Sequence, residues 1–305
     1  MIQLNVDGIG FVRVDSWDDI ESIPGYTEDL HISDDEKLSE VIGVYDFPLK
    51  IRCGISTCHQ QHNKGYIVKT VSGSVTNIGN VCGRKIFNVE FKEKKKIFDR
   101  DLADSGNREK LWLIRNQLDG YDERLAGVLD GNAGAVALER KLRAFKGSNY
   151  RIPREVGDFL RSAVRTRDSV IYHSRVATAD EVAIEEALIG RRVQRPYYVS
   201  EPICVVDGIE SLHGDSDLKK ILISDLKVNF SRLREMDIDS ATSKELKDMA
   251  LWSGKIEELF EKAEVAIGYC RRFLDKNNLN KLLNIELKRG KDREHFVSVI
   301  KESSI

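Results

Sequence analysis

The strongest constraint on this chain is a cluster of cysteines and histidines between residues 53 and 82. Three of the five cysteines and two of the six histidines fall in this short stretch. A tetrahedral Zn²⁺ site needs four sulfur or nitrogen ligands, about 2.0 to 2.3 Å from the metal. The segment therefore predicts a zinc site in which Cys53, Cys58 and Cys82 are three of the ligands.

The order of elements around these cysteines is typical of a treble-clef zinc finger. The first two cysteines flank Gly54-Ile-Ser-Thr, whose small residues allow a tight knuckle. Residues 66–71 and 74–78 are rich in β-forming side chains and predict a hairpin. Asn80 is then expected to cap a helix, which puts the third cysteine in its first turn, near the positive end of the helix dipole.

The fourth ligand is expected to be a histidine, because Lys85 stands where a four-cysteine site would have its last sulfur. His62 lies four residues after Cys58 and faces back toward the knuckle, so we favour it. His59 is the alternative, although a residue adjacent to a ligand usually points away. Three thiolates and a neutral histidine carry a net charge of −1, which favours basic outer-shell partners: Arg52, Lys64, Arg84 and Lys85.

Other uses of these cysteines remain open. A disulfide is disfavoured by the odd cysteine count and by the lack of a secretory signal. A reactive thiol would need a neighbouring base with an orienting acid, and none is evident in the sequence. If neither histidine binds, three cysteines and a water would form a catalytic zinc site. A closed structural zinc is the interpretation we favour.

Length and composition predict a mainly helical protein with several domains. The chain has 305 residues, of which 41% are hydrophobic and 32% charged, and only five prolines. We expect an α+β fold with a β element and a zinc finger followed by a helical body. The expected segments are an N-terminal β-containing element (1–50), a treble-clef zinc domain (51–104), a mixed, mainly helical middle domain (105–214) and a C-terminal helical hairpin (215–305).

The N-terminal residues predict a hairpin and not a signal peptide. Apolar residues alternate over residues 2–6 and 9–14, with Asp7-Gly8 between them as a turn. No run approaches the roughly 20 apolar residues of a membrane span. We therefore expect a cytoplasmic protein, in the host cytoplasm if it is encoded by a phage, with no membrane partner.

Several spaced motifs in the first hundred residues resemble uncharacterised bacteriophage and prophage proteins. The motifs are Gly8-x-Gly10-x-Val12 with Ser16-Trp17-Asp18-Asp19-Ile20-Glu21 and Pro24-Gly25, then Cys53-Gly-x3-Cys58-x3-His62-x2-Gly65-Tyr-x-Val, and Asn77-Ile-Gly-x2-Cys82-Gly-x-Lys-x-Phe87. The resemblance implies a phage-type genomic origin. It implies no established activity.

The C-terminal third carries the clearest helical periodicity. Apolar residues step alternately by three and four, which predicts a coiled-coil-like seam in a helix over residues 246–273. Leucines between residues 218 and 233 predict an earlier helix that pairs with it. A homo-oligomer through the 246–273 helix is a further possibility. The seam residues are Met249, Trp252, Ile256, Leu259, Ala263, Ala266, Cys270 and Phe273.

Charge is distributed unevenly, although the net charge is only −2. Residues 15–41 hold ten acidic residues against one lysine, whereas residues 140–195 hold thirteen basic residues against seven acidic ones. Arginines interleaved with aromatic residues suit phosphate contact and base stacking, and they equally suit internal salt bridges. The candidate nucleic-acid-binding residues are Arg84, Lys85, Arg161, Arg165, Arg167, Arg175, Arg191, Arg192 and Arg195.

Catalytic motifs are not evident. The sequence has no Walker loop, no Gly-x-Ser-x-Gly and no His-Glu-x2-His motif. A metal-dependent ββα nuclease would need a histidine late in the hairpin or on the helix, and none occurs between His62 and His173. We therefore predict a non-enzymatic protein with structural Zn²⁺ that binds DNA or RNA or acts as a regulator. The alternatives are a protein–protein interaction module or inhibitor of a host factor, whose partner is a host or phage protein, and a metal-dependent nuclease.

Overall fold

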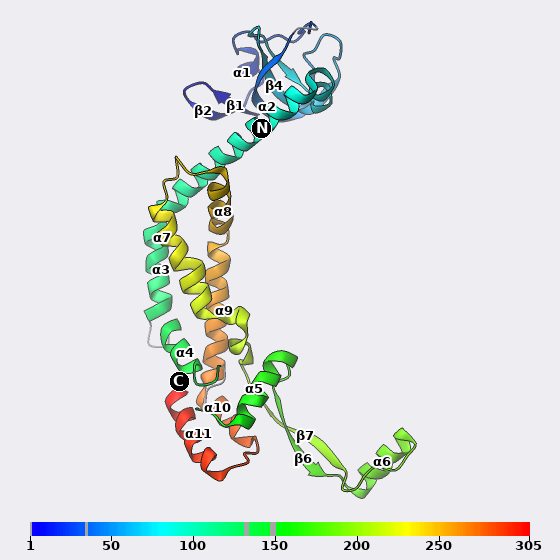
Figure 1. Ribbon diagram of the computed structural model, residues 1–305, viewed down its shortest axis with the longest axis vertical. Helices are drawn as coiled ribbons and strands as arrows, with labels where there is room; N and C mark the ends of the chain where they lie inside the picture. Colours follow the sequence, from blue (N-terminus) through cyan, green and yellow to red (C-terminus); the bar gives the residue numbers. More distant parts are fainter. Residues whose placement is uncertain (1, 34–35, 131–133, 147–150) are drawn as a thin grey trace. The chain divides into compact units, whose positions relative to one another are not determined.

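The computed structural model describes residues 2–33, 36–130, 134–146 and 151–305. It is an α+β protein with an N-terminal sheet and a mainly helical C-terminal region (Figure 1). The chain forms two compact units. Unit 1 comprises Met1–Leu113 and Asp237–Ala250, and unit 2 comprises Ile114–Met236 and Leu251–Ile305. The boundary predicted at residue 50 falls inside a strand, so the N-terminal element and the cysteine cluster share one sheet.

Unit 1 is built on a five-stranded antiparallel sheet with the strand order β2-β1-β3-β4-β5. The predicted N-terminal hairpin is confirmed, with Val6 paired to Gly10 across a turn in which Gly8 has a φ of 77°. The strands are β1 (Ile2–Val6), β2 (Gly10–Val14), β3 (Leu38–Arg52), β4 (Gln61–Thr70) and β5 (Val75–Ile78).

The helices of unit 1 pack onto this sheet. The single turn α1 (Asp18–Glu21) buries Ile20. The long helix α2 (Asn80–Arg115) is kinked at Asn88, where φ is 41° and ψ is −108°. Phe91 lies three residues after the kink and is fully buried against Tyr66, with ring centroids 5.7 Å apart. The acidic segment over residues 28–40 contains no helix in its described part, which excludes residues 34–35.

Residues 237–250 belong to unit 1 because polar contacts hold them against α2. The Ser243 hydroxyl donates a hydrogen bond to the buried Asp104 carboxylate. The Trp112 indole N–H donates to Asp239, and the Lys110 ammonium donates to the Ala250 carbonyl at 2.7 Å. The first half of helix α8 (Ser243–Ser253) is therefore packed against α2, although 127 to 140 residues separate the bonded positions in the sequence.

Unit 2 is a helical assembly around α9 (Ile256–Leu274), which contacts α4, η1 and η3. Phe260 and Phe273 on α9 are fully buried. The other elements are α3 (Leu118–Asp130), α4 (Ala135–Leu142), α5 (Arg154–Thr166), β6 (Val170–Val176), α6 (Ala179–Ile189), β7 (Tyr198–Val205), the 3-10 helices η1 (Ile209–Leu212), η2 (Gly214–Ser216) and η4 (Leu282–Asn284), the π-helix η3 (Lys220–Lys227), α7 (Val228–Glu235), α10 (Lys276–Lys281) and α11 (Gly290–Ser303).

The predicted single helix over residues 246–273 is wrong. The seam is divided between α8 and α9 by a turn at Gly254 and Lys255. Glycine costs about 1 kcal/mol in a helix interior, and the N–H of Lys255 bonds the Trp252 carbonyl at 2.8 Å in a tight turn. The predicted partner residues Leu222 and Leu226 are fully buried on η3, which contacts α9. The α9 part of the seam is thus used inside the chain, and a coiled coil finds no support.

No helix in the described part of the chain is long and apolar enough to cross a membrane.

Candidate metal centre

The knuckle that carries the first two cysteines connects β3 to β4. The N–H of Cys53 bonds the Gln60 carbonyl at 3.0 Å, and the N–H of Cys58 bonds the Ile55 carbonyl at 2.9 Å. Gly54 is required here, because a Cβ at this position would lie 2.1 Å from the Thr76 hydroxyl oxygen. The small residues between the cysteines therefore let the loop fold back onto β5.

The third cysteine comes from the first turn of α2, as predicted. Gly83, its neighbour, lies against the Phe91 ring, where a Cβ would come within 2.6 Å of a ring carbon. This contact seats the start of α2 on the core of unit 1 and fixes the direction of Cys82. The predicted capping role of Asn80 is wrong, because Asn80 is itself the first helical residue and its side-chain oxygen is buried without a partner.

The structure brings the three cysteines together. The Sγ atoms of Cys53, Cys58 and Cys82 all lie within 4.8 Å of one another, and all three are free thiols. In a tetrahedral site with metal–sulfur bonds of about 2.3 Å, the sulfurs would lie about 3.8 Å apart. The Sγ atoms of Cys58 and Cys82 are 2.8 Å apart. That distance is too long for a disulfide bond of about 2.05 Å. A metal ion bound to both sulfurs would increase their separation by about 1 Å.

Backbone N–H groups point at the sulfurs. Ile55 and Gly79 donate to Cys53, and Gln60 donates to Cys58, so each knuckle cysteine accepts from the residue two positions later. Such bonds favour the charged thiolate over the neutral thiol. These N–H groups therefore stabilise the thiolate, which is the form of cysteine that binds a metal, against the opposing effect of burial.

Electrostatics show why three thiolates need a cation between them. Burial raises the pKa of Cys53 above its ordinary value, although the two N–H groups oppose this. Burial and the neighbouring sulfurs raise the pKa of Cys82 to about 12. Burial also acts to raise the pKa of Cys58, but the Cys82 thiol, the Gln60 N–H and the charge of Lys85 together bring it below its ordinary value. The donor set thus fits a soft divalent cation.

Neither histidine belongs to the cluster of three sulfurs. The His62 ring lies against Gly79, where a Cβ would be 2.8 Å from its Cδ2 atom. Its Nδ1 atom is 3.0 Å from the Tyr45 hydroxyl, and its Nε2 atom is buried with no hydrogen-bond partner among the described residues. Burial lowers the pKa of His62, which favours the neutral ring.

The hydroxyl that contacts His62 is held in turn by a buried network. The Asn77 amide donates to the Tyr45 oxygen at 3.3 Å and to the Arg52 carbonyl at 2.7 Å, and it accepts from the Tyr26 hydroxyl at 3.1 Å. Asn77 is only 1% exposed. No local sequence pattern predicts this support, because Tyr26, β3 and β5 are separate segments of the chain.

His59 is arranged differently from His62. It has a left-handed backbone with a φ of 52°, and its Nε2 atom lies 3.4 Å from an Asp29 carboxylate oxygen. Its Nδ1 atom is buried, and the part of the chain that the structure describes offers it no hydrogen-bond partner. Each histidine therefore has one ring nitrogen held and one free, and a histidine would have to move toward the sulfurs to complete a four-ligand site.

Of the predicted basic residues, three are neutralised within unit 2. Arg161 pairs with Asp158 at 2.5 Å. Arg175 pairs with Glu181 and Glu201 at 2.7 and 2.6 Å, and its guanidinium holds the pKa of Glu181 down to about 2. Arg195 lies 3.9 Å from Glu186. Exposed side chains for which the described residues offer no ion pair are Arg84, Lys85, Arg165, Arg167, Arg191 and Arg192.

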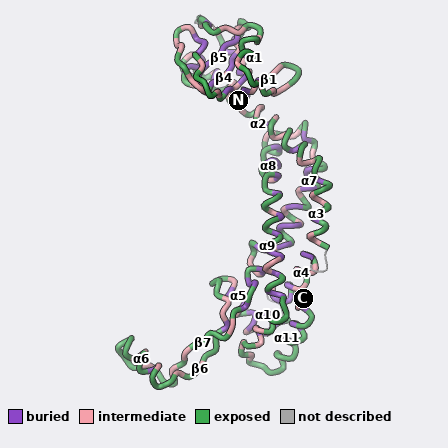
Figure 2. Tube along the Cα trace, turned by 180° about the vertical axis from the view of Figure 1, so that it is seen from behind, coloured by how far each residue is buried: buried purple, intermediate pink, exposed green. Residues whose placement is uncertain are grey.

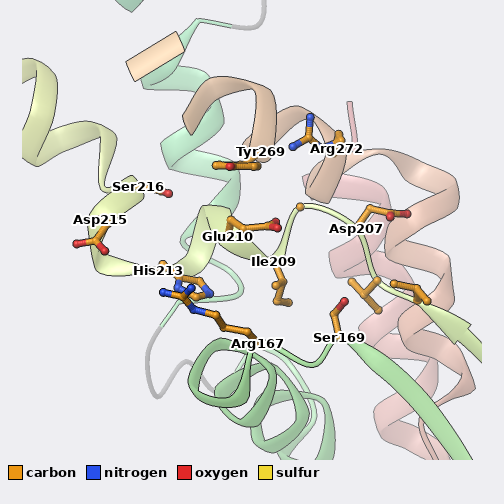
Figure 3. A pocket seen from close by; sticks show the side chains of 13 residues that line it. Arg167, Ser169, Asp207, Ile209, Glu210, His213, Asp215, Ser216, Tyr269 and Arg272 are labelled. Atoms are coloured by element: carbon orange, nitrogen blue, oxygen red, sulfur yellow. The ribbon is translucent and has the colours of Figure 1, made fainter. Parts of the chain in front are cut away.

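Arg167 lines a cavity of about 480 Å³ in unit 2. Figure 3 shows it beside His213, while Arg272 approaches from α9. The Nε2 atom of His213 is buried and has no hydrogen-bond partner within the described ranges. Three carboxylates share the lining: Asp207, Glu210 and Asp215. Because both signs of charge surround this cavity, it matches no single class of ligand.

Comparisons with protein-family models, with curated proteins and with solved structures give no match to this chain.

Proposed function

We propose that the three-cysteine cluster holds a structural Zn²⁺ in a treble-clef-like finger. The observation that carries this proposal is the convergence of three sulfurs from two separate elements, with backbone N–H groups directed at two of them. Sulfur-rich sites select zinc over magnesium, calcium and manganese. The knuckle, hairpin and helix also follow one another in treble-clef order.

His62 is the fourth ligand in this proposal. With hydrogen on Nδ1, the ring donates to the Tyr45 oxygen and leaves a lone pair on the buried Nε2 atom, to which no other described residue bonds. Ligating histidines usually have their second nitrogen held in this way. Four protein ligands close the site, as in structural zinc sites. Lys85, whose charge lowers the Cys58 pKa, would offset the negative charge of the thiolates.

Replacing each histidine tests this assignment. We expect His62→Ala to weaken zinc binding more than about 100-fold, because loss of an outer-shell partner alone costs about 10- to 100-fold. His59→Ala should stay within that smaller range. A competition titration against a chromophoric chelator measures both constants. A larger loss of zinc affinity in His59→Ala than in His62→Ala would identify His59 as the fourth ligand. Equal, small effects would indicate three cysteines and a water, which is the catalytic alternative.

A metal-dependent nuclease is the second candidate. It is favoured by the pairing of His59 with Asp29 beside the cluster, because a histidine oriented by a carboxylate can serve as a general base. Such an enzyme requires an open metal position, so the histidine replacements above also separate the two candidates.

The protein acts, in our proposal, by binding a macromolecule, and the partner we favour is nucleic acid. Support comes from the part of α2 that begins at the cluster. Arg84, Lys85, Lys92 and Lys96 are exposed there, and the described residues give them no ion pair. Nearby Lys95 is different, because it pairs with Asp99 at 2.7 Å. A helix with unpaired cations suits contact with phosphates.

The salt dependence of the binding affinity tests whether the partner is a nucleic acid. If these four side chains contact phosphates of a duplex, log K should fall with log salt with a slope of about −3.6. Affinity for a fluorescent DNA duplex should then fall about 150-fold between 50 and 200 mM salt. Lys92→Ala with Lys96→Ala should reduce the slope by about half, measured by fluorescence anisotropy. The matched control is Lys276→Ala with Lys291→Ala, two exposed lysines of unit 2.

A flat salt response, or no binding to duplex DNA or single-stranded RNA, would overturn the nucleic-acid version. The remaining version is a protein–protein interaction module or an inhibitor of a host factor that acts through the helical body. The resemblance to phage proteins is consistent with either role, and a phage-type origin stays a proposal.

A further inference from the structure

Helix α6 occupies the connection between the two strands of an exposed ribbon. β6 and β7 pair only with each other in the described chain, with Val176 opposite Tyr198 at the end next to α6. Figure 2 shows exposed residues over most of α6 and the ribbon. The segment carries many exposed large apolar side chains: Tyr172, Val176, Ile184, Leu188, Ile189, Tyr198, Ile203 and Val205.

The inner face of α6 is tied to the ribbon. The predicted capping box is confirmed, since Thr178 and Glu181 exchange side-chain and backbone hydrogen bonds. Glu181 also pairs with Arg175 of β6, and Val182 is buried. Gly190 ends the helix with a φ of 68°. These contacts fix which face of the helix is turned outward.

The outer face of α6 is apolar in the middle and oppositely charged at its ends. Ile184 and Leu188 are 61% and 77% exposed and lie one turn apart. Ala187 is exposed between them. Asp180 continues this face toward the helix start, and Arg191 follows just past its end. Neither Asp180 nor Arg191 forms an ion pair with any described residue.

We propose that this outer face binds the same face of a second copy of the chain. In an antiparallel pair with the two-fold axis between Glu185 and Glu186, Asp180 of one copy faces Arg191 of the other. By the same symmetry, Ile184 faces Ala187 and Leu188 faces Ala183 of the other copy. Each large side chain thus meets a small one and each charge meets its opposite, as an isologous interface requires.

The pairing is expected to be weak. An 11-residue helix is about 16 Å long, and two such helices bury less than the roughly 1,200 to 2,000 Å² of a stable interface. The exposed ribbon side chains Val176 and Tyr198 lie next to α6 and can add to the contact. Association should therefore depend on concentration in the micromolar range. Neither the metal centre nor the basic residues of α2 take part in this contact.

Sedimentation velocity of the full chain tests the inference, from low micromolar to several hundred micromolar protein. We expect the mass to rise from 34.7 kDa toward twice that value. Leu188→Glu should weaken association at least about tenfold. The matched control is Val265→Glu, which changes a similarly exposed side chain on α9, 54% exposed, and should leave association unchanged.

Exchanging the charges at positions 180 and 191 tests the antiparallel arrangement of the two helices. Asp180→Arg alone places like charges opposite each other, and so does Arg191→Asp alone, so each variant should associate less than the parent protein. An equimolar mixture of the two should form a heterodimer, because every charge then meets its opposite. Protein that stays monomeric at all concentrations would overturn the inference. So would a dimer that is unaffected by Leu188→Glu, or a mixture that does not associate.

Discussion

Replacing Cys82 by alanine is expected to abolish stoichiometric zinc binding and to shift the thermal unfolding transition of unit 1 to a much lower temperature. Cys82 is the sulfur that connects the start of α2 to the knuckle between β3 and β4. Metal binding couples directly to folding, and structural zinc contributes an apparent free energy of about 10 to 16 kcal/mol in isolated zinc fingers. Only part of this should appear in unit 1, which has its own apolar core.

The measurement is differential scanning calorimetry of the full chain with metal analysis. Unit 2 should keep its transition, while the transition of unit 1 should move to a much lower temperature. Chelation of the unmodified protein should give the same curve as Cys82→Ala. Cys204→Ala is the control, because Cys204 lies on β7, outside the cluster. A Cys82→Ala protein that keeps its melting curve would contradict a structural metal.

Replacing Phe91 by alanine is expected to destabilise unit 1 by about 3 to 5 kcal/mol, the usual cost of removing a buried phenylalanine. Phe91 is fully buried, and its ring contacts Gly83 beside the third cysteine. The cavity would therefore loosen the start of α2 as well as the core. Zinc affinity should fall together with stability.

Hydrogen exchange of the full chain, read by mass spectrometry on β3 and β4, measures this loss within unit 1. Val89→Ala is the control, because Val89 is 55% exposed two residues earlier, and exposed positions usually change stability by less than about 0.5 kcal/mol. A Phe91→Ala effect below about 1 kcal/mol would show that the ring does not hold the helix to the sheet.

Local patterns in the sequence identified the elements around the cysteine cluster. Cysteine spacing and glycine positions predicted the knuckle, and β-rich runs predicted the hairpin that follows it. The capping box at Thr178 was also readable, because its two residues lie three apart and need no other part of the chain. Such signals depend only on neighbours in the sequence, so they can be recognised without knowledge of the tertiary structure.

Sequence spacing did not determine three other features of the chain. Arg175 belongs to a basic segment, yet its charge is taken by Glu181 and Glu201. The heptad spacing suggested one helix, but Gly254 ends α8 and begins a turn. The kink at Asn88 had no cue in the apolar spacing of the helix.

The sequence alone identified the three cysteines of the cluster, the hairpins and the helical character of the C-terminal region, since spacing and turn residues act locally. Tertiary structure decided how closely the three sulfurs approach one another, that Asn77 and Tyr45 hold His62, and which arginines stay unpaired. It also decided that α6 turns Ile184 and Leu188 outward. The physical reason is that convergence, burial and ion pairing depend on segments brought together by packing, and one-dimensional spacing does not contain those distances.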